Sequence, residues 1–193
     1  MRPRTVIKAS LLAAAALALG NWSSTERGRQ ADENGFARVN GGHGPLTDRL
    51  YGGITELGSL YAAAAAAGAL GLAGHRRAAA KAAAAAALTW VAGQALKKVF
   101  VRPRPYEADA RGTRLMIGEP YGASWPSSHP AVLAAFLSVV GRELALGRPS
   151  RKLLGGLGNA VGVSRVYLGV HYPSDVAGGI LLGRAFGELI GGS

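Results

Sequence analysis

The chain has 193 residues, enough for one compact domain, and its low share of charged residues points toward a membrane. Charged residues make up 17% and hydrophobic residues 49%, whereas a typical soluble domain is roughly 25% charged. The formal net charge is +11, but the basic residues stand in small groups between apolar stretches. This distribution is typical of loops that flank membrane spans and argues against nucleic-acid binding. The absence of cysteine excludes a disulfide framework and a thiolate metal site.

Residues 1–20 combine an early basic cluster with a short apolar run that contains small residues near its end. The pattern predicts either a secretory signal peptide or an N-terminal anchor helix, and both alternatives stay open. Either one places residues 21–50 outside the cytoplasm. That segment is polar and contains Gly41-Gly42 and Gly44-Pro45, so we predict an extracytoplasmic loop with room for a short surface helix.

Further apolar stretches follow at residues 53–74, 78–96, 130–146, 153–168 and 176–190. The first two are close to the roughly 20 residues that a spanning helix needs. The last three are shorter and contain charged side chains, so hydropathy alone would also fit a soluble Ala/Gly-rich helical bundle. Small residues let membrane helices approach closely, and examples here are Gly155, Gly156, Gly158 and Gly162. We predict an all-α, membrane-embedded bundle of about five or six spanning helices.

Counting the crossings assigns a side of the membrane to each connection. The short turns around Arg77 and Arg151 are dense in Arg and Lys, which fits cytoplasmic turns under the positive-inside rule. Residues 97–129 then lie outside the cytoplasm, together with the connection that follows residue 168. Neither His75, predicted to lie in a cytoplasmic turn, nor His43, predicted to lie in a loop, has a motif beside it.

Several aromatic side chains stand near the predicted ends of the spans. They are predicted to anchor the chain at the membrane–water interface or, alternatively, to pack in the core. These residues are Tyr121, Trp125, Tyr167 and Tyr172.

Three clusters of residues carry the chemistry: residues 97–105 (KKVFVRPRP), 125–130 (WPSSHP) and 164–175 (SRVYLGVHYPSD). Pro favours the first position of a helix, so Pro130 and Pro173 predict that one helix begins just after His129 and another just after His171-Tyr172. The crossing count puts both helix starts on the same side of the membrane, where the first cluster joins them.

Helix N-termini present free N–H groups and a partial positive charge, which suits a phosphate group. We expect Lys97, Arg104 and Arg165 to reach the same pocket, where Arg offers a planar fork and Lys a point charge to phosphate oxygens. Phosphoryl transfer needs this stabilisation of the equatorial oxygens together with in-line positioning. Taken singly, the first cluster also fits a solvated basic face or an inner-leaflet anchor, and the second fits a turn or a helix cap, whereas the third is a pattern that rarely arises by chance.

The histidines provide a nucleophile and an acid. A neutral imidazole can attack phosphorus, and an Asp on its other ring nitrogen would fix the tautomer. Asp175 stands four residues after His171, across a helix start, and fits this role. A second histidine would protonate the leaving oxygen and later activate water. His129 is the other histidine that lies beside a motif.

Together and in this order, the clusters resemble the signature of the type 2 phosphatidic acid phosphatase (PAP2) superfamily, which is Lys-x6-Arg-Pro, Pro-Ser-Gly-His and Ser-Arg-x5-His-x3-Asp. The first part is matched by Lys97 and Arg104-Pro105, and the third by Ser164-Arg165, His171 and Asp175. The second part is matched by Pro126, Ser127 and His129 but departs at Ser128, where the family usually has Gly. Because Gly permits positive φ and close backbone approach, an altered pocket or reduced activity is a hypothesis. The resemblance covers roughly residues 35–193.

The resemblance implies a role for each matching residue. His171 would form a phosphohistidine, Asp175 would orient it, and His129 would act first as general acid and then as base. The substrate phosphate would be held by Lys97, Arg104, Ser127, Ser128 through its backbone, and Arg165. The family needs no metal, and we expect no metal or other cofactor here. Residues 51–193 would form the PAP2-like phosphatase domain in a bacterial-type cytoplasmic membrane, with its active site on the extracytoplasmic side.

The resemblance leaves the substrate open among lipid phosphates and diphosphates in contact with membrane lipids. Undecaprenyl diphosphate, phosphatidic acid, phosphatidylglycerophosphate and a lipid A phosphate all fit, with specificity expected in residues 106–123. A secreted soluble acid phosphatase of the same superfamily is an alternative that detergent-free solubility would favour. A vanadium-dependent haloperoxidase is disfavoured by the short, apolar chain. A non-catalytic membrane protein that binds lipid phosphates is disfavoured by the complete set of catalytic side chains.

Overall fold

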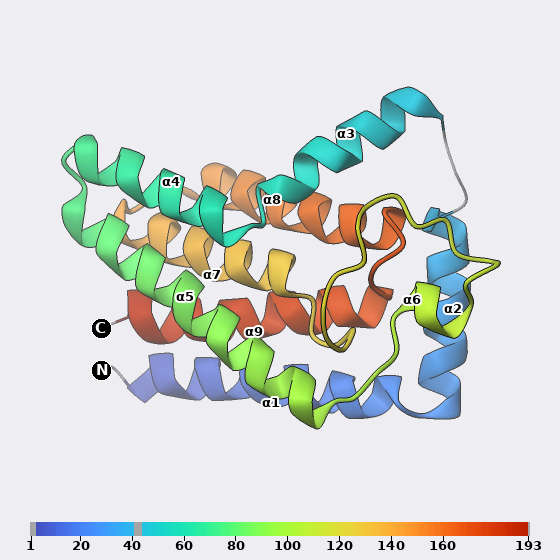
Figure 1. The fold of residues 1–193 in the computed structure, drawn as a ribbon. Helices are drawn as coiled ribbons and strands as arrows, with labels where there is room; N and C mark the ends of the chain where they lie inside the picture. Colours follow the sequence, from blue (N-terminus) through green and yellow to red (C-terminus); the bar gives the residue numbers. More distant parts are fainter. Residues whose placement is uncertain (1–2, 41–43, 193) are drawn as a thin grey trace.

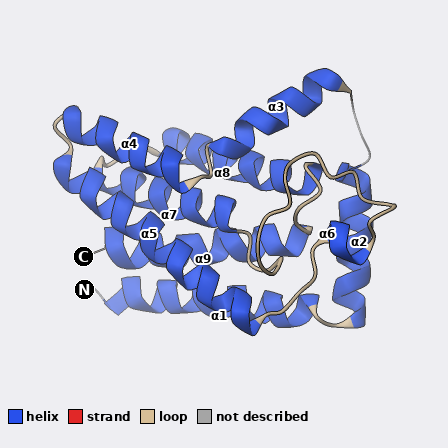
Figure 2. Cartoon of the chain, viewed as in Figure 1, coloured by secondary structure: helices blue, strands red, loops and turns tan. Residues whose placement is uncertain are grey.

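The computed structural model describes residues 3–40 and 44–192, which form helices and loops without a strand among them (Figure 2). His43 and the Gly41-Gly42 pair, which we predicted to lie in a loop, fall outside the described residues. The all-α prediction is confirmed. The helices are α1 (Pro3–Ser23), α2 (Glu26–Asn40), α3 (Pro45–Glu56), α4 (Leu60–Leu72), α5 (Arg76–Val99), α6 (Pro105–Ala108), α7 (Ser128–Glu143), α8 (Arg148–Tyr167) and α9 (Pro173–Gly191).

The long helices pack lengthwise into a bundle in which α9 lies between α1 and α7 (Figure 1). At one end of the bundle, α5 and α8 finish while α7 and α9 begin. We call this the loop end, because residues 100–127 and 168–172 gather there (Figure 1). Helix α2 lies across the loop end, and both chain termini lie at the opposite end (Figure 1). The three motif clusters therefore meet at one end of the bundle, as the crossing count predicted.

Glycines on one face of α9 let its backbone touch that of α7. A Cβ atom added to Gly179 would lie 2.3 Å from the carbonyl oxygen of Ser127, and one added to Gly183 would lie 2.1 Å from that of Ala131. Such distances are too short for any side chain larger than hydrogen. The spacing of four residues places both glycines on the same face of the helix, which is a common way for membrane helices to pack closely.

The glycines of α8 behave differently from our prediction. Of the four that we expected to allow close helix contact, only Gly162 is tightly packed, with Val176 2.4 Å from an added Cβ atom. An added Cβ atom on Gly156 or Gly158 would meet nothing within 4 Å, and one on Gly155 would just reach the guanidinium of Arg184. The prediction was wrong for these three because composition does not tell which helix face meets a neighbour.

Two predicted boundaries also differ from the structure. Residues 21–50, predicted to be mainly a loop, contain the helix α2 and the start of α3. The stretch 53–74 is not one helix, because the chain breaks between α3 and α4. There Ser59 caps α4 by accepting a hydrogen bond from the N–H of Ala62 at 3.1 Å, and Gly58 packs against His129 with no room for a Cβ atom. The break thus brings residues 55–59 to the loop end.

Several charges inside the apolar stretches are paired at the end of the bundle opposite the loop end. Glu143 of α7 accepts a hydrogen bond from Lys81 at 2.8 Å and lies 3.3 Å from Arg77, both of α5. Glu188 of α9 pairs with Lys8 at 2.6 Å and with Arg142. These pairs explain how short apolar stretches with charged residues still form packed helices.

The aromatic residues at the loop end mostly support the core. Trp125, Tyr167 and Tyr172 are buried, so for them the core alternative is correct, whereas Tyr121 is fully exposed. The ring of Trp125 packs against Phe100 in a tilted arrangement, with 4.3 Å between centroids, and fills the space left by Gly178 of α9. Trp125 thereby packs the loop that carries the second motif against the helices of the bundle.

One helix among the described residues, α1, is long and apolar enough to cross a membrane by length and composition, and α4 is apolar but shorter. Buried Ala9, Ala16 and Gly20 show that α1 also packs within the bundle. The predicted count of about five or six spans and the division at residues 20 and 50 stay predictions.

A matched pair of Gly→Ala substitutions tests the α7–α9 contact. We expect Gly183→Ala to lower the free energy of unfolding by about 3 kcal/mol or more, because the new methyl group would collide with the Ala131 carbonyl. Gly156→Ala should be neutral or stabilising by up to about 1 kcal/mol, because that position is open and Ala favours helix. Apparent melting temperatures in one detergent provide the measurement, and equal values for both variants would contradict the packing described.

Candidate active site

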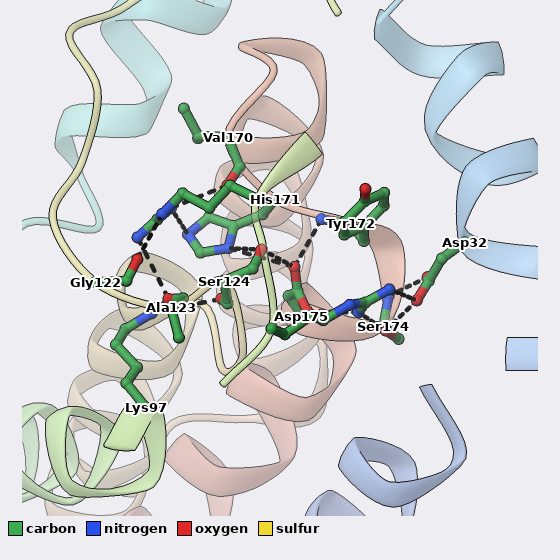
Figure 3. Close-up of polar contacts among 12 residues, drawn as sticks. Asp32, Lys97, Gly122, Ala123, Ser124, Val170, His171, Tyr172, Ser174 and Asp175 are labelled. Carbon is green, nitrogen blue, oxygen red and sulfur yellow. Dashed lines mark hydrogen bonds and ion pairs between the residues drawn. The ribbon is translucent and has the colours of Figure 1, made fainter. Parts of the chain in front are cut away.

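Three buried cations converge at the loop end. Lys97 comes from the last turn of α5, Arg104 from the connection after it, and Arg165 from the last turn of α8. Backbone carbonyl groups hold two of them: Lys97 donates to Ala123, and Arg104 donates to Gly122 and Val170 at 2.9 Å each (Figure 3).

No ion pair within the described parts of the chain involves Lys97, Arg104 or Arg165. Neutral carbonyl partners orient these side chains without cancelling their charge. The pocket therefore keeps a strong positive potential, which suits a phosphate dianion.

His171 lies at the centre of this group, in the connection between α8 and α9. Its Nε2 atom is 3.3 Å from the guanidinium of Arg104. Arg is only a donor, so this contact requires an unprotonated Nε2 with a free lone pair, and the proton of the neutral ring is then on Nδ1. Burial, reinforced by the charges of Arg104, Lys97 and Arg165, lowers the pKa of His171 well below its ordinary value. The imidazole is consequently neutral near pH 7, with its lone pair directed to the side where Arg104 lies.

Asp175 lies behind His171 and is fully buried in the first turn of α9, where the sequence placed it. Its Oδ2 atom accepts hydrogen bonds from the Ser124 hydroxyl at 2.5 Å and from the N–H of Tyr172 at 2.8 Å (Figure 3). The same oxygen is 3.5 Å from Nδ1 of His171, and so is the Ser124 oxygen from that nitrogen. These distances are at the long limit of hydrogen bonding, so the direct contact of Asp175 and Ser124 with the imidazole is weak.

Arg102 ties this carboxylate to α2. It donates to Oδ1 of Asp175 at 2.8 Å and to Asp32 at 2.7 Å, and its guanidinium lies 4.2 Å above the ring of Tyr172. Burial alone would lower the pKa of Arg102, but Asp175 and Asp32 together outweigh burial and raise the pKa. Asp32 also accepts hydrogen bonds from the N–H and the hydroxyl of Ser174 (Figure 3). Unlike the charges of Lys97, Arg104 and Arg165, the positive charge of Arg102 is balanced by ion pairs with two carboxylates.

The second motif borders the same pocket. His129 lies in the first turn of α7, which begins at Ser128 rather than after His129 as predicted. The charges of Arg165, Arg104 and Lys97 act on its ring, and its side chain forms no hydrogen bond with the described residues. The N–H of Ser127 donates to the carbonyl of Asp175 at 3.0 Å, which joins the starts of α7 and α9.

Two polar atoms in the pocket are buried without a hydrogen-bond partner among the described residues: Oγ of Ser127 and Nε of Arg165. The rest of the Arg165 guanidinium is held by Thr55 of α3, at 2.8 Å from Nη1 to the hydroxyl oxygen. A buried donor without a partner costs roughly 1–3 kcal/mol. Each of these atoms can donate a hydrogen bond to an oxyanion, so the donor set fits a phosphate group.

Sequence reasoning missed Arg102, Ser124, Asp32 and Thr55. Arg102 stands in the first cluster, and its distinct role depends on which carboxylates reach it. Ser124 directly precedes the second cluster, which was the available signal. Asp32 and Thr55 lie far from the motifs along the chain, and only the folding of α2 and α3 brings them to the site.

A model of the PAP2 superfamily matches residues 59–190, which include all the predicted site residues. The chain belongs to the PAP2 superfamily. The resemblance found in the sequence is thereby confirmed.

A solved structure named as a PAP2-type enzyme and curated relatives named as phosphatases are similar to this chain. A crystal structure of a transmembrane PAP2-type phosphatidylglycerolphosphate phosphatase from Bacillus subtilis superposes with a TM-score of 0.80 at 27% identity, covering 96% of this chain and 94% of the other. The decaprenylphosphoryl-5-phosphoribose phosphatase of Mycobacterium tuberculosis is 34% identical over 95 residues, 49% of each chain. An undecaprenyl-diphosphatase of Bacillus subtilis is 32% identical over 107 residues, 53% of this chain and 52% of the relative. The chain thus spans about half the length of the curated relatives it matches.

The departure from the PAP2 pattern at Ser128 causes no backbone strain. Ser128 is the first residue of α7, and among the described residues other than glycine only Ala145 has a positive φ. Its hydroxyl oxygen lies 3.4 Å from the side-chain nitrogen of Gln94 on α5. The left-handed conformation that would favour glycine is therefore not needed at this position.

A pair of neighbouring substitutions on α2 tests the Asp32–Arg102 contact. We expect Asp32→Ala to lower the free energy of unfolding by roughly 2–4 kcal/mol, because it removes a buried carboxylate that holds Arg102 and Ser174. Amide hydrogen exchange in residues 26–40 should accelerate in this variant. Glu33→Ala, which removes an exposed carboxylate beside it, should leave both quantities near the original values. Similar exchange in the two variants would show that α2 is held by other contacts.

Proposed function

We propose that this protein is a membrane-embedded phosphatase that hydrolyses a lipid phosphate or diphosphate through a phosphohistidine on His171, without a metal. The observation that carries the proposal is the buried imidazole of His171, whose Nε2 lies 3.3 Å from Arg104, beside cations that form no ion pair with the described residues. The relatives that resemble the chain are phosphatases of lipid-linked phosphates by name, which supports the same class of reaction.

In the proposed first step, Lys97, Arg104 and Arg165 hold the equatorial oxygens of the substrate phosphate, with the Ser127 hydroxyl and the N-terminus of α7. Nε2 of His171 attacks phosphorus as Arg104 turns from the ring toward the phosphate. The bond from phosphorus to the lipid oxygen breaks, and His129 gives a proton to that oxygen. For this step His129 takes up a proton as the phosphate anion binds and offsets the neighbouring cations, and it recovers that proton from water in the second step. Asp175 stabilises the positive charge that develops on the His171 ring.

In the second step, His129 accepts a proton from water as the water oxygen attacks phosphorus. The phosphorus–nitrogen bond breaks, inorganic phosphate leaves, and His171 returns to its neutral form. Both steps use groups of this chain alone, so a metal ion has no part in the proposed mechanism.

We propose that the bundle crosses the membrane, with α1 retained as an anchor helix and the loop end on the extracytoplasmic side. Large apolar side chains such as Leu11, Leu72, Val91 and Leu153 are exposed on the outer faces of different helices, where lipid would cover them. Helix α5 has 24 residues, about 36 Å, which is long enough to cross the hydrocarbon core. The basic residues at its ends would extend toward the interfaces.

The substrate class follows from the pocket and its position. A phosphate monoester or diphosphate at the end of a lipid fits cations that lie where the helices meet the interface. Phosphatidylglycerophosphate, phosphatidic acid and polyprenyl diphosphates therefore form the proposed substrate group. Residues 106–123, which run from α6 to just before the second motif and supply carbonyl partners of Lys97 and Arg104, are proposed to select among them.

The first test is phosphate release by the detergent-purified protein from a panel of lipid phosphates and diphosphates, with EDTA present. We expect release from at least one lipid. His171→Ala should lower kcat by about 10⁴-fold or more, because no other group there can form the covalent intermediate.

Substantial turnover by His171→Ala would refute the nucleophile, and loss of activity in EDTA would refute the metal-free mechanism. If a folded protein released no phosphate from any lipid, the pocket would instead serve to bind lipid phosphates.

Ser128→Gly tests the departure from the PAP2 pattern. Because residue 128 is helical and has no positive φ, we expect kcat/KM to stay within about threefold of the original or to rise. Steady-state kinetics on the best lipid from the panel provide the measurement. A loss of tenfold or more, about 1.4 kcal/mol, would assign the Ser128 hydroxyl a role in the reaction.

A further inference from the structure

A second polar groove lies at the opposite end of the bundle from the phosphatase pocket. It has a volume of about 400 Å³ and is bordered by α1, α7, α8 and α9. Its polar lining includes the basic side chains of Lys8, Arg142, Arg151 and Arg184 and the carboxylate of Glu188. None of these residues takes part in the proposed reaction.

The two arginines of α8 and α9 lie over the groove rather than away from it. The side chain of Arg151 passes over Gly141 of α7, with Nε 3.9 Å from a Cβ atom added there. The guanidinium of Arg184 lies over Gly155 of α8, with a nitrogen 4.0 Å from an added Cβ atom. Both side chains thus lie close to the neighbouring helix beside the groove.

The charge of the groove is unbalanced. Glu188 is buried and pairs with Lys8 and with Arg142. Within the described residues, neither Arg151 nor Arg184 forms an ion pair. The groove therefore contains four cations and one carboxylate. The guanidinium groups of Arg151 and Arg184 can still bind an anion that this chain does not supply.

The remaining lining is apolar and lies between helices. Leu12, Leu137, Leu154 and Ile180 line the groove beside the arginines. A groove that combines paired arginines with an aliphatic wall suits a phosphodiester attached to acyl chains better than it suits free phosphate. Basic pockets between membrane helices are a recurrent way to bind anionic lipid headgroups.

We propose that this groove binds the headgroup of an anionic phospholipid, with Arg151 and Arg184 on the phosphodiester and the acyl chains along α7 and α8. Its lining residues lie mainly on the halves of α7, α8 and α9 that are far from the loop end, so the site is separate from the phosphatase pocket. The proposal requires that the bundle lies in a membrane, as proposed above, but it does not require that the protein hydrolyses any substrate.

Lipid binding to the full chain in a neutral detergent tests this proposal. The probes are phosphatidylglycerol and phosphatidylcholine with the same acyl chains, and bound lipid is measured by native mass spectrometry. Inorganic phosphate at saturating concentration is added to occupy the phosphatase pocket, and the His171→Ala protein is measured in parallel.

We expect Arg151→Gln/Arg184→Gln to weaken phosphatidylglycerol binding by roughly thirtyfold, since each basic side chain beside an anionic lipid contributes about fivefold. The matched control is Arg148→Gln/Lys152→Gln, which removes the same charge from exposed positions of α8 outside the groove. It should bind as the original does, and so should His171→Ala. If the double variant does not fold, Arg151→Gln alone should show the fivefold loss.

Equal phosphatidylglycerol binding by the groove variant and the control would overturn the proposal. It would also be overturned if phosphatidylcholine bound as tightly as phosphatidylglycerol, or if inorganic phosphate displaced the lipid from both the original protein and the control. A protein that releases no phosphate from any lipid but loses phosphatidylglycerol in the groove variant would support this site while refuting the phosphatase proposal.

Discussion

The buried carboxylate of Asp175 is the interaction on which the loop end depends. Its two oxygens receive Arg102, the Ser124 hydroxyl and the N–H of Tyr172, and its backbone carbonyl receives the N–H of Ser127. These partners come from the loop after α5, the second motif and the connection before α9. A fully buried charge is tolerated only with such a complete set of donors. The same contacts that stabilise Asp175 therefore assemble the three motifs around the imidazole.

The buried cations of the site are of two kinds, which differ in whether their partners are charged or neutral. Arg102 is matched by two carboxylates and contributes to stability, whereas Lys97, Arg104 and Arg165 are oriented by carbonyl and hydroxyl groups that leave their charge uncancelled. Burying such cations disfavours the folded state. A phosphate dianion would supply the negative charge that these buried cations lack. The free energy that is lost when the cations are buried would therefore be recovered when the dianion binds.

The motif residues could be predicted from the sequence because their spacing carries the chemistry, and the helix start at Pro173 followed from the local role of proline. Asp32 could not be predicted, because it stands in a polar segment without a motif and reaches Arg102 only through the position of α2. The break before α4 had a signal in Gly58-Ser59, but the apolar run around it suggested one continuous span. For the glycines, composition predicted close helix contact, and only the three-dimensional arrangement showed that α9 rather than most of α8 supplies it.

The glycine face of α9 has a consequence for how this protein responds to mutation. Since the α7 backbone rests directly on Gly179 and Gly183, no side chain between them can adjust if one helix shifts. His129 lies in the first turn of α7, and His171 lies just before the start of α9. The distance between the two imidazoles therefore depends on how α7 and α9 are aligned along their length. In the proposed mechanism, the α7–α9 contact at Gly183 would therefore help to set the distance over which a proton passes from His129 to the leaving oxygen. Changes there would slow turnover while leaving substrate affinity nearly intact, which is a pattern usually attributed to residues that touch the substrate.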